Sequence, residues 1–200
     1  MIKIKYKDCL ETYPEFPRSD HAKDQFYFPK VYKTHDLILH SKSAKGHAKN
    51  LSISFSKLIS QMKIGSLIFL GDNQRAWRYQ DNQYPPVQEA LHYLDNNEVG
   101  KRFDGGLKVS LEELPTFINH LFWLVRCNAA LPIFHFIDDQ ENIVGSLCQH
   151  GNVHISTFSA SAEGLFGDAL SKTEFIINNG ETCYSTFTRS SKISGRKTPV

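Results

Sequence analysis

Three side chains that could ligate a metal ion occur within seven residues in the C-terminal half of the chain. Cys148, His150 and His154 supply one thiol and two imidazoles, which are ligand types that zinc prefers. The sequence around them predicts a hairpin with a two-residue turn, His150-Gly151. Because side chains alternate between the two faces of a strand, this register places Cys148 and His154 on opposite faces. The sequence therefore predicts no metal site here and no cofactor.

The polar loop Asp72–Tyr79 is a second candidate, and it contains Arg75, Trp77, Arg78 and Tyr79. Arginine binds phosphate with a fixed fork geometry, and aromatic rings stack on bases. The same residue types dominate binding energy at protein interfaces. We therefore expect this loop to form part of a binding surface. The alternative is a structural loop in which the tryptophan is an anchor and the arginines are solvated.

Positive charge is unevenly distributed, although the net charge of the 200-residue chain is only +2. Between residues 30 and 63, seven lysines accompany a single acid, and Lys45 and Lys49 lie on one face of the helix predicted there. Such a face suits a phosphate backbone. The alternative is a solvated helix face, which the nearly neutral total charge also fits. A nucleic-acid-binding protein is therefore one function that the sequence leaves open.

Nucleophilic catalysis has one candidate residue, Cys127, which follows Arg126 at the boundary of a predicted element. A neighbouring cation lowers the pKa of a thiol and favours the reactive thiolate. The alternative is an inert buried cysteine. Asp138 and Asp139 are better explained as turn residues than as a paired acid and base. The chain has no G-x-S-x-G, Walker or H-E-x-x-H motif, so the sequence does not decide whether it is an enzyme.

The apolar pattern predicts the helices and strands that must position these residues. Apolar side chains at helical spacing predict a helix over residues 43–63, and the run SLIFL predicts a buried strand over 66–70. A second helix is expected over 86–94. A third helix is expected to begin at Ser110, because Ser110-Leu-Glu-Glu113 has the sequence of a capping box.

The C-terminal half has mainly the character of strands. Apolar runs at 132–138, 143–149 and 153–158 predict an antiparallel meander. The runs 173–177 and 182–187 flank an Asn-Gly pair and predict a further hairpin. The predicted fold is α+β, with a mainly antiparallel sheet of about five strands from the C-terminal half and two or three packed helices.

Composition and patterning set the expected organisation and location. Hydrophobic residues make up 40% of the chain and charged residues 22%, as in ordinary globular proteins. We expect residues 1–189 to form a single α+β domain and residues 190–200 to form a basic, flexible tail. The chain has no apolar run long enough to cross a membrane and no signal-peptide pattern at its start. With four widely scattered cysteines, it is expected to be cytoplasmic, with reduced thiols.

Residues 70–152 resemble the middle of a thymidylate synthase. The matching pieces are short and follow the order found in that family: Leu70-Gly71, Arg75, the helix 86–94, Lys101-Arg102, Cys127-Asn128 and the hairpin ending at Asn152. The resemblance implies a nucleotide-handling enzyme in which Arg75 and Arg102 bind phosphate and Cys127 is the nucleophile. The chain departs from the family at Arg126, where the family has a proline, and its C-terminal third has no Asp-x-x-His-x-Tyr pattern.

The function that the sequence favours is a non-enzymatic binding protein that masks or recruits a macromolecular partner. An ordinary core, uneven surface charge and the lack of a catalytic signature are typical of prokaryotic or phage accessory proteins of the immunity, defence or counter-defence kind. A protein is the expected partner, nucleic acid or a nucleotide is the alternative, and no membrane is expected. The nucleotide-handling enzyme and the nucleic-acid binder are the second and third hypotheses.

Overall fold

The computed structural model describes residues 1–20, 25–71, 75–79, 81–129, 133–180, 182–188, 190 and 192–197. Five helices lie in these residues: α1 (Tyr6–Thr12), α2 (Ala44–Gln61), α3 (Pro85–Asn96), α4 (Leu114–Cys127) and α5 (Ala160–Leu170). The first five strands are β1 (Ile2–Ile4), β2 (Arg18–Asp20), β3 (Gln25–Tyr27), β4 (Lys33–Ile38) and β5 (Ser66–Leu70). The other five are β6 (Gly106–Ser110), β7 (His135–Asp138), β8 (Ile143–Leu147), β9 (Val153–Thr157) and β10 (Ile176–Ile177).

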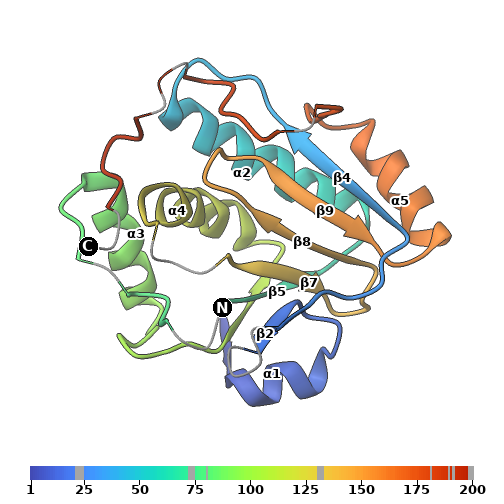
Figure 1. The fold of residues 1–200 in the computed structure, drawn as a ribbon, viewed down its shortest axis with the longest axis horizontal. Helices are drawn as coiled ribbons and strands as arrows, with labels where there is room; N and C mark the ends of the chain where they lie inside the picture. Colours follow the sequence, from blue (N-terminus) through green and yellow to red (C-terminus); the bar gives the residue numbers. More distant parts are fainter. Residues whose placement is uncertain are drawn as a thin grey trace.

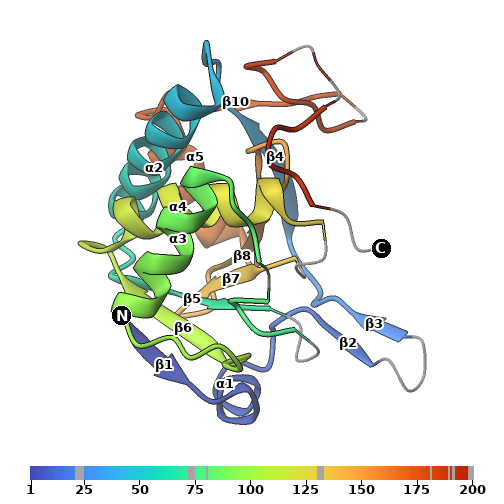
Figure 2. The same cartoon turned by 90° about the vertical axis from the view of Figure 1, so that its left-hand side faces the viewer.

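Eight of the strands form one sheet in the order β1-β6-β5-β7-β8-β9-β4-β10, and every neighbouring pair is antiparallel. Strands β2 and β3 form a separate hairpin that projects from the body (Figure 2). In Figure 1, β7, β8, β9 and β4 follow one another across the sheet. This succession brings the turn between β8 and β9 close to the chain that follows α5.

The main core lies between one face of the sheet and α2, α3, α4 and α5 (Figure 2). Strands β8 and β9 contribute Ile143, Leu147, Val153 and Ile155 to it. Because successive side chains of a strand point to opposite faces, the residues between them face away from the helices. His154 is therefore presented on the face of the sheet opposite the main core.

A smaller core covers part of that second face. Cys9 of α1 and the following Tyr13 pack with Ile68, Leu70 and Ile137 of β5 and β7. Strand β5 is buried along its whole length, since its alternate side chains enter the two cores. This explains why its sequence is continuously apolar instead of alternating.

The predicted α+β class with an antiparallel sheet is confirmed, but the sheet is larger than predicted. It has eight strands rather than about five, and there are five helices rather than two or three. The strands that the pattern did not predict include β4 in the N-terminal half and β6 just past the middle of the chain. Helix α5 was not predicted, although Ser159 caps it through a hydrogen bond from the backbone N–H of Ala162 (3.1 Å).

Several predicted elements occur with small shifts in their bounds. Helices α2 and α3, strand β5 and the meander β7-β8-β9 match the expected ranges. The third helix begins at Leu114 instead of Ser110. The Ser110 and Glu113 side chains and backbones do bond to each other as in a capping box (2.8–3.4 Å), but the bonds close a turn between β6 and α4.

The hairpin predicted from 173–177 and 182–187 is wrong. Ile176 and Ile177 pair with Ile38 and Leu37 of β4, because the outer edge of β4 offers backbone partners to this segment. Residues 182–187 are not in a strand, and Glu181 lies outside the described residues. The segment 182–188 instead runs past the turn between β8 and β9.

Residues 192–197 lie against the end of α4. The backbone N–H of Lys197 donates to the carbonyl of Cys127 (2.9 Å), and that of Ala129 donates to Lys197 (3.0 Å). Whether residues 190–200 form a flexible tail in solution stays a prediction. Among the described helices, none has both the length and the apolar character needed to cross a bilayer.

Candidate metal centre

The turn between β8 and β9 has three residues instead of the predicted two. Ser146 pairs with His154, and the backbone N–H of Cys148 donates to the carbonyl of Asn152 (3.0 Å). Gly151 closes the turn with a φ of 83°, the left-handed conformation found at the end of three-residue hairpin loops. The predicted register is therefore wrong by one residue. A shift of one residue reverses the faces, so Cys148 and His154 lie on the same face.

The segment 182–188 adds a second thiol to this pair. The Sγ atom of Cys183 lies 3.6 Å from Sγ of Cys148 and 3.4 Å from Nε2 of His154. One ligand atom from each of these three residues lies within 4.8 Å of the other two. His150, the third member of the predicted cluster, instead has its Nδ1 atom 3.4 Å from Oγ of Ser185. We call Cys148, His154 and Cys183 the ligand cluster.

Asp36 holds the imidazole of the cluster. It pairs directly with His154 in the register of β4 and β9, and its Oδ1 atom lies 2.5 Å from Nδ1 of His154. A carboxylate on one imidazole nitrogen fixes the proton there and leaves the other nitrogen free to accept or ligate. In His154 that other nitrogen is Nε2, which faces Cys183.

Asn152 contacts the cluster from the buried side. It is fully buried, and its Nδ2 atom donates to Sγ of Cys183 (3.1 Å) and to the carbonyl of Tyr184 (3.1 Å). Its side-chain oxygen has no hydrogen-bond partner among the described residues. Amide donors to sulfur are among the outer interactions that orient thiolate ligands. Asn152 therefore positions Cys183 in the way that Asp36 positions His154.

Two of the three separations within the cluster are close to the edges of a tetrahedral zinc site, and the third, between Cys148 and His154, is at most 4.8 Å. Two sulfur atoms at about 2.3 Å from a tetrahedral zinc ion lie about 3.8 Å apart, and a sulfur and a nitrogen ligand lie about 3.6 Å apart. The observed distances are 3.6 Å between the two sulfur atoms and 3.4 Å from Cys183 to His154. Cys148, Cys183 and His154 can therefore hold one zinc ion in common.

The two thiols interact so that one of them is readily ionised. The hydrogen bond from the Cys148 thiol lowers the pKa of Cys183, and the Asn152 amide and His154 lower it further against the opposing effect of burial. The same hydrogen bond and burial raise the pKa of Cys148. A thiolate is the form that binds metal and attacks electrophiles, so the cluster has at least one sulfur suited to either role.

Arg126 connects the two segments that carry the thiols. Its Nη1 atom donates to the carbonyl of Gln149 (2.9 Å) and to Oγ of Ser185 (3.3 Å). Its guanidinium lies 4.6 Å from the centre of the Phe187 ring, and only 4% of the residue is exposed. Because Gln149 follows Cys148 and Ser185 lies two residues after Cys183, Arg126 limits the movement of one segment relative to the other.

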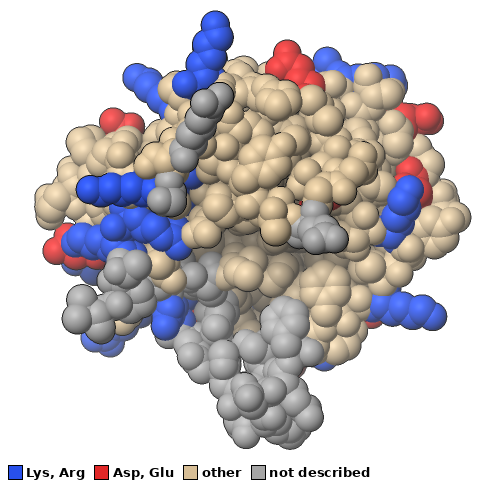
Figure 3. All heavy atoms as spheres, turned by 45° about the horizontal axis from the view of Figure 1, so that its top comes forward, with Lys and Arg blue, Asp and Glu red and all other residues tan. Residues whose placement is uncertain are grey.

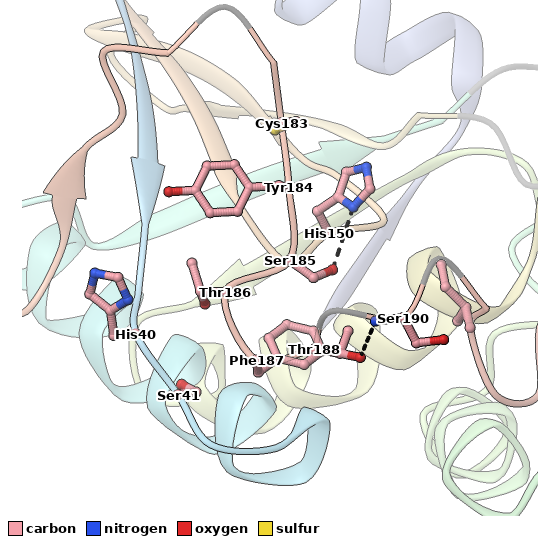
Figure 4. A pocket seen from close by; sticks show the side chains of 11 residues that line it. His40, Ser41, His150, Cys183, Tyr184, Ser185, Thr186, Phe187, Thr188 and Ser190 are labelled. Carbon is pink, nitrogen blue, oxygen red and sulfur yellow. Dashed lines mark hydrogen bonds between the residues drawn. The ribbon is translucent and has the colours of Figure 1, made fainter.

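Two cavities adjoin the cluster. The larger, about 810 Å³, is lined by Cys183 and by hydroxyl and imidazole side chains (Figure 4). In Figure 4, His40 and His150 lie on opposite sides of Tyr184. The smaller cavity, about 320 Å³, is lined by Cys148 and His154. A metal ion in the cluster would therefore have a ligand-sized space beside it.

Some residues of the predicted binding loop 72–79 have a structural role. Residues 72–74 lie outside the described residues. Trp77 is fully buried, with Nε1 donating to Gly105 (2.8 Å) and its ring stacked on Phe134 at 4.0 Å. Arg78 forms an ion pair with Asp95. Trp77 and Arg78 thus fit the alternative of a structural loop, and a binding surface at Arg75 and the exposed Tyr79 stays a prediction.

The lysines predicted to bind nucleic acid and the arginine predicted to bind a nucleotide phosphate are exposed. Lys45 and Lys49 lie on the outer side of α2, and Arg102 is exposed in the turn after α3. Figure 3 shows lysines and arginines mainly near the margin of the face in view, with uncharged surface in the middle. Nucleic-acid binding stays an untested prediction.

Cys127 is unsuited to the nucleophilic role that the sequence suggested. It is fully buried at the end of α4, and burial raises the pKa of its thiol to about 11 despite the nearby Arg126. Its Sγ atom lies 3.5 Å from the carbonyl of Ser194. The neighbouring cation was the correct observation, but burial outweighs it.

Comparison of the chain with protein-family models, with curated proteins and with solved structures gives no match. The resemblance to thymidylate synthase therefore gains no support. The case for function depends on the geometry of the ligand cluster.

Proposed function

We propose that the protein binds one zinc ion through Cys148, Cys183 and His154 and uses it as a catalytic centre. The observation that carries this proposal is the pair of distances within the cluster, 3.6 Å between the sulfurs and 3.4 Å from sulfur to nitrogen. The donor set also fits, because two thiolates and an imidazole favour zinc over magnesium or calcium, which prefer oxygen.

The number of ligands supports a catalytic role over a structural one. Structural zinc sites have four protein ligands, whereas catalytic sites have three and keep the fourth position for water or substrate. Within the described residues, the cluster offers three ligands. A cavity of about 320 Å³ is lined by two of them, Cys148 and His154. The fourth position therefore has space for water and a small substrate.

The chemistry that follows is hydrolysis or another reaction of a polarised carbonyl. A zinc ion held there would act as a Lewis acid, polarising a carbonyl and lowering the pKa of a bound water. Asp36 bonds to Nδ1 of His154, which would leave Nε2 to ligate the metal. Arg126 and Asn152 keep the two thiol-bearing segments together.

Zinc affinity measured by competition with a chromophoric chelator, under reducing conditions, tests this proposal. We expect one zinc ion per chain, and Cys183→Ser should weaken binding by at least about a hundredfold, more than the loss of an outer-shell partner costs. Cys127→Ser is the matched control, because a hydroxyl keeps the donor to Ser194. A chain without zinc affinity, or equal losses in the two variants, would contradict the proposal.

A thiol-dependent enzyme is the second candidate, favoured by the order Cys183, His154, Asp36. The Sγ atom of Cys183 lies 3.4 Å from Nε2 of His154, whose Nδ1 atom is 2.5 Å from Asp36. This is the arrangement of nucleophile, base and orienting carboxylate. Iodoacetamide labelling of the metal-free chain distinguishes the two candidate functions. In a thiol enzyme, Cys183 should still react fast in the Cys148→Ser variant, and added zinc should not increase the activity.

A further inference from the structure

The smaller cavity beside the ligand cluster has two chemically different parts. Cys148 and His154 form one part, and Val125, Ile133 and Leu147 contribute apolar walls. Arg196 is the one residue with a permanently charged side chain among the described residues that line it. The volume of about 320 Å³ is at the lower end of the range for small-molecule sites. The space therefore suits a small molecule with a short apolar body.

Arg196 is held in place by backbone contacts around it. Its neighbour Lys197 forms an isolated parallel bridge with Asn128, and the backbone N–H of Lys197 donates to Cys127 (2.9 Å). The guanidinium itself donates from Nη1 to the carbonyl of Arg126 (2.7 Å). A guanidinium has five N–H donors, and this bond uses one of them. The side chain is therefore positioned while most of its donors stay available.

The charges around the cavity leave an excess of positive charge. Among the described residues, no Asp or Glu lies within ion-pair distance of Arg196 or Arg126. The carboxylate of Asp36 is bonded to His154. A zinc ion with two thiolates is electrically neutral, so the ligand cluster does not balance both arginines. Arg126 is buried and Arg196 is partly buried, and an uncompensated charge removed from water is unfavourable, so an anion in the cavity would stabilise them.

We propose that this cavity is the substrate site and that it binds a small monocarboxylate with a short branched or unbranched hydrocarbon body. The Arg196 guanidinium binds the carboxylate through its fork of N–H donors. Val125 and Ile133 contact the hydrocarbon, and the molecule lies beside the open position of the zinc. This assignment rests on the proposed zinc centre for its catalytic meaning, but the anion site itself does not require the metal.

A carboxylate fits better than a phosphate ester. A phosphate carries up to two charges and three strong acceptor oxygens, and such groups are met by several donors or by a helix N-terminus. Here one guanidinium faces a cavity whose other walls include Val125, Ile133 and Leu147. A single bidentate contact matches the two oxygens of a carboxylate.

Calorimetric titration of the metal-free protein with 4-methylpentanoate tests the anion site, with 4-methylpentanamide as the neutral control. We expect the acid to bind and the amide to bind at least about tenfold more weakly. Arg196→Gln should remove that preference, a loss of about 1.4 kcal/mol or more for the acid. Lys192→Gln is the matched control, because Lys192 is an exposed cation on the same segment and does not line this cavity.

The same ligands added to cobalt-substituted protein test the position of the site relative to the metal. The acid should alter the visible d–d bands of the bound cobalt in the parent chain, but not in Arg196→Gln. If cobalt does not bind, the zinc proposal fails, while the calorimetry still decides the anion site. If cobalt binds but acid and amide bind equally, or if Arg196→Gln binds the acid normally, the anion site is overturned and the zinc centre stands.

Discussion

The two turns at the ends of β8 contain polar groups of different kinds. At the turn before β8, Asp138 is only 2% exposed and accepts hydrogen bonds from the backbone N–H groups of Asn142 (2.7 Å) and Ile143 (2.9 Å) and from the Asn142 amide (2.8 Å). All its partners lie within five residues. Such a carboxylate is fully satisfied by its own turn, so it stabilises the hairpin and has no capacity left for a ligand.

At the other end of β8, the polar groups converge from distant parts of the chain. Asp36, Cys148, His154 and Cys183 come from two strands, a turn and the C-terminal segment. The thiols and the imidazole point at one another, and each can bind a metal ion. The comparison suggests a criterion: locally satisfied polar groups serve stability, while groups brought together from afar and directed at a common point serve binding.

The largest expected effect is a loss of zinc affinity, and it is expected at only one of the two turns. Cys148→Ser removes a ligand and should weaken zinc binding by at least about a hundredfold, roughly 2.7 kcal/mol. The stability of the metal-free chain should change little, because Cys148 is only partly buried. Chelator competition and urea unfolding of the same samples measure both quantities. Retained zinc affinity would show that Cys148 is not a ligand.

The opposite pattern is expected at the first turn. Asp138→Ala leaves the backbone N–H groups of Asn142 and Ile143 and the Asn142 amide without their acceptor and should lower the free energy of unfolding by about 2 kcal/mol. Zinc affinity should be unchanged, because Asp138 makes no contact with the cluster. Asp138→Asn keeps one acceptor oxygen and should cost less. A loss of zinc affinity in Asp138→Ala, with stability intact, would reverse the assignment of the two turns.

A smaller effect on zinc affinity is expected at Asp36, which contacts a zinc ligand and not the zinc itself. Asp36→Asn keeps the size of the side chain but weakens the hold on Nδ1 of His154. Loss of such a carboxylate partner typically costs 10- to 100-fold in metal affinity, and we expect about tenfold. Thr34→Val on the same strand, whose Oγ1 atom bonds Ser156 instead (2.8 Å), should leave zinc affinity unchanged. Equal effects in the two variants would mean that Asp36 does not support the site.

The smallest expected effect concerns the loop that the sequence marked as a binding surface. Arg78 pairs with Asp95 and donates to the carbonyl of Val99 (3.2 Å), so Arg78→Ala should lower the free energy of unfolding by about 1 kcal/mol. Exposed Arg102→Ala should stay within about 0.5 kcal/mol. Thermal unfolding compares the two. An unchanged Arg78→Ala protein would favour a binding role for this side chain.

Much of the fold was predictable because local patterns determined it. The apolar stripe of α2 and the continuous run of β5 gave the correct type and nearly the correct bounds. The strands β4 and β6 gave little local signal, since their pairing depends on sheet neighbours far along the chain. The failed hairpin at 173–187 has the same cause: an Asn-Gly turn signal was outweighed by pairing with β4.

The sequence identified part of the candidate site. Cys148 and His154 were identified, but a two-residue turn was assigned where the chain has three, and this single shift separated them. Gly151 at the third position of the loop was the available signal, because it supports a left-handed residue there. No local pattern connects Cys183 or Asp36 to this turn. The predicted role as a binding protein for a macromolecular partner has not been tested, and it stays a prediction beside the zinc proposal.

X-ray absorption at the zinc edge tests the central claim most directly. The purified chain, reconstituted with one equivalent of zinc under reducing conditions, should show two sulfur neighbours at about 2.3 Å and two nitrogen or oxygen neighbours at about 2.0–2.1 Å. One of the light neighbours should show the outer-shell scattering of an imidazole. A first shell of only nitrogen and oxygen, or one with four sulfurs, would contradict a site built from Cys148, Cys183 and His154.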